Sequence, residues 1–258
     1  MIDQRAIIDP SAKLGKNVSV GAWSIIGPHV EIGDDTVIEA HVSVKRDTKI
    51  GKHNHIYSFA SIGDDPQHLG YKDQKVFLEI GDHNVIREFC TLNRGSMDGD
   101  GTTRIGSHNF MMAYCHVAHD CVVGNHIIFA NNASIAGHVH VNDYVILGAF
   151  AGIHQFCHIG SYAFLGRACK IVQDIPPYMM IKGNPGGPCG LNAVGLKRHK
   201  FTSEQIKHIK ETYHLLYCEG LKLKEAYDIL KERSKKQPEL KLFIDLMDHG
   251  TRGLARPD

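Results

Sequence analysis

The sequence predicts a mainly β protein: a left-handed parallel β-helix of hexapeptide repeats with triangular coils, followed by a C-terminal α-helical domain. Aliphatic residues recur every six positions, glycine commonly follows them, and the position four residues after each is usually small. An α-helix would need apolar spacings of three and four, and a β-meander would show turn signals every 8 to 12 residues. A period of six is therefore typical of a solenoid.

The aliphatic positions form three runs, from Ile8 to Ile62, from Ile80 to Leu92 and from Ile105 to Ile171. We expect each hexad to make one short strand and one corner, so that three hexads close one coil. The periodic aliphatic side chain would point to the axis, and stacked coils would pair as parallel strands about 4.8 Å apart.

Glycines and cysteines fit the same repeat. Glycine after the aliphatic position, as in Gly15 and Gly21, suits corners that need positive φ or a close backbone approach. Five of the seven cysteines fall on the small inward position and are interpreted as core side chains: Cys90, Cys115, Cys121, Cys157 and Cys169. An odd number of cysteines without closely paired spacing suits free thiols in a reducing compartment.

The repeat is interrupted twice, near 63–79 and 93–104, and we expect loops that leave one face of the solenoid there. Long loops on a rigid scaffold often carry function. After Ile171 the repeat ends, and the prolines of QDIPPY and GNPGGPCG indicate a linker. The expected domains are therefore a β-helix over 1–190 and a helical domain over 191–258.

Three helices are expected in the second domain. The first begins at Thr202 and Ser203 and can end at Gly220, the second covers about 222–235, and the third about 238–247. These helices would cap the open end of the solenoid or build part of a site.

The formal net charge of +1 argues against disorder and against nucleic acid as a partner. Residues 197–241 hold twelve Lys/Arg and seven Asp/Glu, a surplus of five positive charges that is either a solvated helix surface or a docking patch for an acidic partner. The chain begins without a signal-peptide pattern and contains no stretch of membrane-spanning length, so we expect a cytoplasmic protein without stable membrane insertion.

Histidines concentrate in the third run. With three hexads per coil, two neighbouring columns form along one edge within roughly 10 Å: His119, Gly137 and Gln155, and beside them Asp120, His138 and Phe156. A histidine beside a carboxylate can act as a general base, and a glycine N–H one coil away can receive an oxyanion. Two alternatives remain open, a polar ladder without a chemical task and a zinc site between subunits as in trimers resembling the gamma carbonic anhydrases.

The segments HVAHDC, ANNASIAGHV, IHQFC, QDIPPY, GLKR and TRGL resemble the UDP-N-acetylglucosamine acyltransferases of lipid A biosynthesis over nearly the whole chain. The resemblance implies transfer of a 3-hydroxyacyl group from acyl carrier protein to the 3-position of UDP-N-acetylglucosamine. It also implies a homotrimer with active sites in clefts between subunits, and neither cofactor nor metal, since the carrier-protein thioester is a co-substrate. The family's nitrogen-acylating sibling carries an N-terminal uridine-binding domain, for which repeats starting at Ile8 leave no space.

Carried over to this sequence, the resemblance makes His119 the general base, Asp120 its orienting partner and the Gly137 N–H the oxyanion donor. The positions matching substrate-contacting residues are His116, His138, His154, Gln155, Asn192, Arg198, His199 and His68, of which Asn192 and Arg198 match nucleotide-binding positions. His68 and His199 stand where the family usually has other residues, so the acceptor atom at position 3 is open between oxygen and nitrogen.

Arg167 matches the position that limits acyl length, a glycine in long-chain members of the family. A larger side chain there should shorten the groove, so acyl groups shorter than about C14 are expected. An acetyl-CoA-dependent transferase on the same scaffold remains a further alternative.

Overall fold

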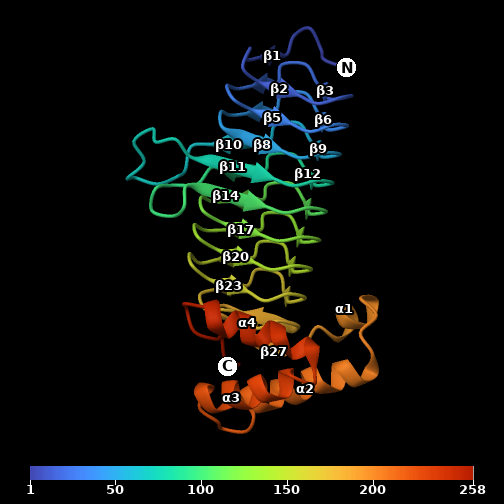
Figure 1. Cartoon of the computed structure of the whole chain (residues 1–258), viewed down its shortest axis with the longest axis vertical. Helices are drawn as coiled ribbons and strands as arrows, with labels where there is room; N and C mark the ends of the chain where they lie inside the picture. Colours follow the sequence, from blue (N-terminus) through green and yellow to red (C-terminus); the bar gives the residue numbers. More distant parts are fainter. Residues whose placement is uncertain (258) are drawn as a thin grey trace.

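The computed structural model describes residues 1–257, and it confirms the predicted left-handed parallel β-helix with C-terminal helices. Three parallel sheets run the length of the solenoid, which begins at the N-terminus and ends against the helices (Figure 1). In the described residues, the first sheet contains β1 (Ile7–Ile8), β4 (Ile25–Ile26), β7 (Ser43–Val44), β10 (Ser61–Asp64), β13 (Thr91–Asn93), β16 (His116–Val117), β19 (Ser134–Ile135), β22 (Gly152–Ile153) and β25 (Lys170–Ile171).

The second and third sheets complete the triangle. The second contains β2 (Lys13–Leu14), β5 (Glu31–Ile32), β8 (Thr48–Ile50), β11 (Phe77–Ile80), β14 (Thr102–Ile105), β17 (Val122–Val123), β20 (His140–Val141) and β23 (His158–Ile159). The third contains β3 (Ser19–Val20), β6 (Val37–Ile38), β9 (His55–Ile56), β12 (Val85–Ile86), β15 (Phe110–Met111), β18 (Ile128–Phe129), β21 (Ile146–Leu147), β24 (Phe164–Leu165), β26 (Met179–Gly183) and β27 (Gly186–Leu191).

The strand register follows the repeat and shows where the chain is inserted. Most partners lie three hexads apart, as for Ile8 and Ile26. Ile80, however, pairs with Ile50 and with Ile105, so additional residues leave the solenoid on both sides of β11. Both loops, between β10 and β11 and between β13 and β14, project from the edge that joins the first sheet to the second (Figure 1).

The periodic aliphatic residues fill the axis, and the small inward residues pack between them. Ile56, Ile86, Met111 and Phe129 are fully buried, as are the five cysteines predicted to be core side chains. Burying each large aliphatic side chain stabilises the fold by roughly 1.5–3 kcal/mol.

Polar residues at the small inward position bond to the backbone; Ser24 Oγ, for example, donates to the carbonyl of Glu39 at 2.7 Å. The core therefore tolerates them without leaving buried polar groups unsatisfied.

Positive φ falls elsewhere than expected. Gly15 and Gly21 have negative φ and are required by close approach instead, because a Cβ at Gly21 would lie 2.5 Å from the Ala40 nitrogen. The left-handed conformation occurs two residues later, at non-glycine residues such as Trp23 and Asp35. Hydrogen bonding to neighbouring coils over-determines these corners and holds the strained conformation.

The predicted linker is wrong in part, because β26 and β27 form an antiparallel hairpin that extends the third sheet. A short helix, α1 (Ala193–Arg198), follows it and was not predicted. The expected helices correspond to α2 (Ser203–Tyr217), α3 (Leu223–Ser234), and a 3₁₀ turn at Pro238–Leu240 that continues into α4 (Lys241–His249).

The helices cover the open end of the solenoid (Figure 1). The buried Tyr178 hydroxyl donates to the Glu239 carbonyl at 2.7 Å, and α4 contacts β23. The chain end then returns to the solenoid, where Leu254 forms a β-bridge with Asp174. Among residues 1–257, no helix is long and apolar enough to cross a bilayer.

Candidate active site

The predicted base and its partner lie at the edge between the first and second sheets, where β16 ends and the chain turns toward β17. Asp120 occupies this corner at a φ of 59°, which aspartate tolerates better than most residues. Its backbone N–H donates to Thr103 Oγ1 at 2.8 Å, which fixes the turn. The corner therefore directs the His119 side chain outward, beside the loops that leave the same edge.

His119 and Asp120 form a directly bonded pair. His119 Nδ1 lies 2.8 Å from Asp120 Oδ2, and the two side chains are 12% and 3% exposed. An ionised carboxylate accepts from Nδ1–H, so this bond selects the tautomer whose Nε2 carries no proton. Nε2 is thereby available to accept a proton from a bound molecule.

Burial alone would raise the pKa of the Asp120 carboxyl, but hydrogen bonds oppose this effect. The side chains of His119 and Ser96 and the Ser96 backbone donate to the carboxylate, and together with the nearby His138 they hold the pKa of Asp120 below its ordinary value. Burial lowers the pKa of His138. Near neutral pH the corner therefore holds a carboxylate beside a neutral His138.

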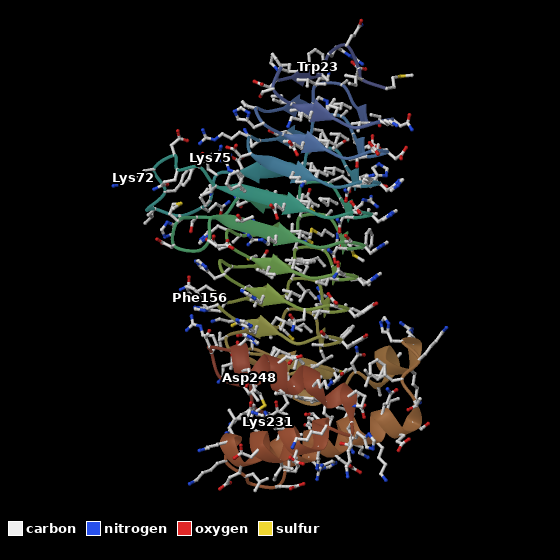
Figure 2. The ribbon with its side chains drawn as sticks, in the orientation of Figure 1. Trp23, Lys72, Lys75, Phe156, Lys231 and Asp248 are labelled. Carbon is white, nitrogen blue, oxygen red and sulfur yellow. The ribbon has the colours of Figure 1, made fainter. Side chains whose placement is uncertain are left out.

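His138 and Phe156 continue the column that begins with Asp120, as the repeat predicted. The His138 and Phe156 rings stack with centroids 4.5 Å apart, and His138 meets His119 edge-on at 5.2 Å. Figure 2 shows Phe156 on the edge from which Lys72 and Lys75 of the first loop also project.

Gly137 lies directly against the His119 ring. A Cβ at this position would come within 2.6 Å of His119 Cε1, so only glycine leaves room for the imidazole. At the edge between the second and third sheets, the N–H at this corner position can be bonded by a side chain; the backbone N–H of Asn125, for example, donates to Asp143 Oδ1 at 2.7 Å. Within residues 1–257 the Gly137 N–H has no acceptor, so it can donate to a bound oxygen.

A groove of about 540 Å³ runs along the outer face of the first sheet from this corner. The sequence-predicted residues that line it are His116, His119, Gly137, His154 and Gln155. The outward residues of β19, β22 and β25, which are Ser134, Gly152 and Lys170, form its floor. His116 is fixed by a 2.7 Å hydrogen bond between its Nδ1 and Thr91 Oγ1, and burial lowers its pKa.

Sequence reasoning missed three residues at this site. Gln67 lines the groove from the first loop, and Ser96 bonds Asp120 from the second. Arg252 reaches the same edge from the chain end, where Nη2 donates to His154 Nδ1 at 2.9 Å and Nε to the Gln155 carbonyl at 3.1 Å. The segment TRGL was a signal for Arg252, but nothing in the repeat predicts where this segment packs.

His68 also comes to the site from the first loop. Its ring meets that of His119 edge-on at a centroid distance of 5.5 Å, and its Nε2 lies 3.1 Å from Asp98 Oδ2 in the second loop. The two loops therefore contact each other over His119.

Four expected site residues lie away from His119. Asn192 caps α1 and donates to the Tyr162 carbonyl, and His199 packs edge-on against Tyr144 and Tyr162, so both lie with Arg198 near the edge between the second and third sheets. Arg167 lies at the remaining edge, where its Cζ is 6.0 Å from the Phe150 ring centroid. Within one chain, the expected base, its partner and the oxyanion donor therefore lie together, whereas the residues expected to contact the nucleotide lie at a different edge.

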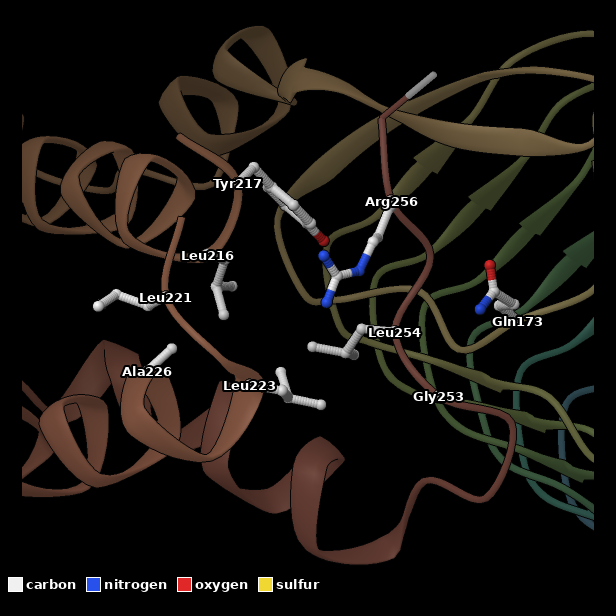
Figure 3. A pocket seen from close by; sticks show the side chains of 9 residues that line it. All are labelled: Gln173, Leu216, Tyr217, Leu221, Leu223, Ala226, Gly253, Leu254 and Arg256. Carbon is white, nitrogen blue, oxygen red and sulfur yellow. The ribbon is translucent and has the colours of Figure 1, made fainter. Parts of the chain in front are cut away.

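A different cavity, of about 210 Å³, lies among α2, α3 and the returning chain end. Figure 3 shows its apolar side chains, including Leu216, Leu223 and Leu254, with Arg256 nearby. None of its lining residues belongs to the expected site.

Comparisons with known proteins identify relatives of this chain. A family model described as Udp N-acetylglucosamine O-acyltransferase, domain 2, matches residues 174–255, and a bacterial transferase hexapeptide model matches residues 11–46. The acyl-[acyl-carrier-protein]–UDP-N-acetylglucosamine O-acyltransferases of Neisseria gonorrhoeae and Halorhodospira halophila are 50% and 48% identical to this chain, each over 99% of both chains. The solved UDP-N-acetylglucosamine acyltransferase of Francisella novicida superposes with a TM-score of 0.98 at 41% identity, covering 100% of this chain and 94% of that one.

Proposed function

The chain belongs to the UDP-N-acetylglucosamine O-acyltransferase family, and we propose that it transfers a 3-hydroxyacyl group from acyl carrier protein to the 3-position of UDP-N-acetylglucosamine, the first step of lipid A biosynthesis. The observation that carries this proposal is the bonded His119–Asp120 pair, with the Gly137 N–H beside it, at the wall of an open groove. The names of the relatives supply the donor and the acceptor.

His119 is the general base of the proposed reaction. Asp120 holds the imidazole through Nδ1, so Nε2 can take the proton of the sugar 3-hydroxyl as its oxygen attacks the thioester carbonyl. The Gly137 N–H donates to the oxyanion of the tetrahedral intermediate. As the C–S bond breaks and the new C–O bond remains, the imidazolium returns the proton to the departing thiolate of the carrier protein.

The groove suits an acyl chain and a sugar. The groove follows the first sheet, so an acyl chain can lie across the small outward residues Ser134 and Gly152, while His116, His154 and Gln155 offer polar contacts near the reacting atoms. We assign His138, whose ring meets that of His119, to the same contacts. His68 completes this end of the site from the loop above. Arg167 is the proposed limit on acyl length.

We assign nucleotide binding to Asn192, Arg198 and His199. Because these residues lie at a different edge from His119, the proposal requires a second copy of the chain, and we propose a homotrimer with each site in the cleft between two solenoids. The positive surplus of residues 197–241 supports docking of an acidic carrier protein. The reaction needs no cofactor, and we place it in the cytoplasm.

The test is an assay of purified protein with UDP-N-acetylglucosamine and 3-hydroxyacyl carrier proteins of several chain lengths, with the product identified by mass. Ester formation at position 3 supports the proposal. Turnover only with the 3-amino analogue would change the acceptor atom, and turnover with acetyl-CoA instead of carrier protein would favour the acetyltransferase alternative.

The same corner supports one other function, metal-dependent hydration chemistry. Ligand atoms of His119, Asp120 and His138 lie within 4.8 Å of one another, a separation that a zinc ion could bridge. However, His119 Nδ1 bonds the carboxylate at 2.8 Å, so an ion held by Nδ1 would have to replace this bond. Metal analysis of protein purified without chelators separates the two: stoichiometric zinc favours hydration chemistry, and metal-free protein with acyl transfer activity excludes it.

A further inference from the structure

The second loop inserts a serine against the Asp120 carboxylate. Ser96 is 2% exposed, its backbone N–H donates to Asp120 Oδ1 at 2.8 Å, and its hydroxyl donates to Oδ2 at 2.6 Å. Both carboxylate oxygens are therefore held by one residue from a loop that the solenoid repeat does not require. The loop is shaped for this contact, because a Cβ at Gly99 would lie 2.5 Å from Asp120 Oδ1.

Two histidines lie within reach of the Asp120 carboxylate. Oδ2 lies 2.8 Å from His119 Nδ1 and 3.7 Å from His138 Nε2. A carboxylate free to rotate about its χ2 torsion could turn toward His138, which would release the His119 ring and its tautomer. The two bonds from Ser96 fix the plane of the carboxylate and remove this freedom.

We propose that Ser96 is a positioning residue for the reaction: its hydroxyl and N–H hold the Asp120 carboxylate aimed at His119, so that the imidazole presents an unprotonated Nε2 to the acceptor. This inference rests on the proposed function of His119 as a general base. Ser96 acts through Asp120 and does not line the groove.

The hydroxyl also sets the pH range of the pair. A hydroxyl donates more strongly to a lone carboxylate than to one already paired with an imidazolium, so Ser96 favours the deprotonated pair. Removing the hydroxyl should let the His119–Asp120 pair keep its proton to a higher pH. The acid limb of the pH–rate profile should therefore shift to higher pH. The titration belongs to the pair as a unit.

The test compares Ser96→Ala, Ser96→Thr and Ser11→Ala by steady-state kinetics across pH 5 to 9. Ser96→Ala should lower kcat about tenfold with KM values within about twofold, and raise the apparent pKa of kcat/KM by about half a unit. Ser96→Thr, which keeps the hydroxyl, should have the kcat and the apparent pKa of the original protein. Ser11→Ala is the matched control, because Ser11 also donates both its N–H and its hydroxyl to a carboxylate, in this case to Asp9 Oδ1 far from the site, and it should behave like the original protein.

Unchanged kcat and pH profile in Ser96→Ala would overturn the inference, and so would equal losses in Ser96→Ala and Ser96→Thr with lowered melting temperatures. A second measurement separates this outcome from failure of the proposed function. Nitrogen-15 NMR titration of the His119 imidazole needs no substrate: a shifted titration in Ser96→Ala supports positioning even if the original protein fails to acylate UDP-N-acetylglucosamine, whereas an unshifted one refutes it.

Discussion

The His119 corner depends on the size of the residues around it. Gly137 and Gly99 have no side chain, and this lets the imidazole and the carboxylate approach the backbone of the next coil and of the loop. Asp120 adopts positive φ, as corner residues along the whole solenoid do, and its bonds with Thr103 and Ser96 fix its backbone and its side chain.

Replacing His119 by Ala removes the proton acceptor while leaving the solenoid axis untouched, since the side chain points outward. We expect kcat to fall by about 10² to 10⁴ with little change in melting temperature, because general base catalysis contributes that much to rate. His29→Ala at an earlier coil of the same edge is the control and should keep full activity. Activity retained in His119→Ala would remove this residue as the base.

Strands and loops differ in how far their sequence determines them. Each short strand of the solenoid repeats one rule, an inward aliphatic residue every six positions, so the period alone is enough to place Ile135 and Leu147 and to align the columns of His119 and Asp120. The contact of Ser96 with Asp120 joins a loop residue to one 24 positions later, and no period relates them. The packing of Arg252 on His154 spans 98 positions and was equally hidden.

The hairpin of β26 and β27 shows a different reason for failure. Its sequence is rich in glycine and proline, which predicts a linker by local propensity. In the structure the end of the third sheet offers unpaired backbone groups at β24, and β26 pairs with them. Tertiary hydrogen bonding therefore outweighs a local preference for irregular structure.

Arg167 gives a prediction about the groove. Replacing it by Gly removes a side chain that now lies against Phe150 at one edge of the first sheet. We expect the original protein to prefer acyl groups shorter than about C14 and Arg167→Gly to shift the optimum to longer chains, because the groove lengthens. Rates across a ladder of 3-hydroxyacyl carrier proteins measure the optimum. Equal or faster turnover of the longest chain by the original protein would contradict the proposed role.

The packing of α4 on the second sheet makes stability depend on pH. His140 stacks on His158 at 4.4 Å in a cavity that α4 closes, and His249 and Asp245 line the same space. Burial, with the neighbouring His158, His138 and His249, lowers the pKa of His140 to about 4, and burial also lowers that of His158.

Below its ordinary pKa of 6.5, His140 binds a proton in the unfolded chain but not in the folded one. Stability should therefore be highest above pH 6.5 and fall progressively as the pH drops toward 4. Between pH 7.5 and 4.5, the melting temperature of His140→Gln should fall by less than that of the original protein. The melting temperature of His29→Gln, in which an exposed histidine is replaced, should fall by as much as that of the original protein. If the melting temperatures of the original protein and His140→Gln fall equally as the pH is lowered, this buried imidazole does not cause the loss of stability in acid.

At the scale of the whole molecule, the three-sided solenoid places the residues proposed for the reaction at three different edges. The proposed base lies at one edge, the residue proposed to limit acyl length at a second, and the proposed nucleotide contacts at the third, beside α1. Within one rigid solenoid these edges cannot approach each other. Parallel packing of identical solenoids would bring one edge of each against a different edge of its neighbour, and each cleft would then combine residues from two chains.

Subunit complementation tests this arrangement directly. His119→Ala and Arg198→Ala, each inactive or severely impaired alone, are co-expressed with different tags and the mixed oligomers are purified through both. If each site takes its base from one chain and its nucleotide contact from a neighbour, the purified mixed trimers should recover about a third of the original activity, because one of the three clefts in every mixed trimer joins two intact halves. Sites contained in single chains would give no recovery. Co-expressing His119→Ala with Asp120→Ala, whose lesions fall in the same half-site, is the matched control and should also give none.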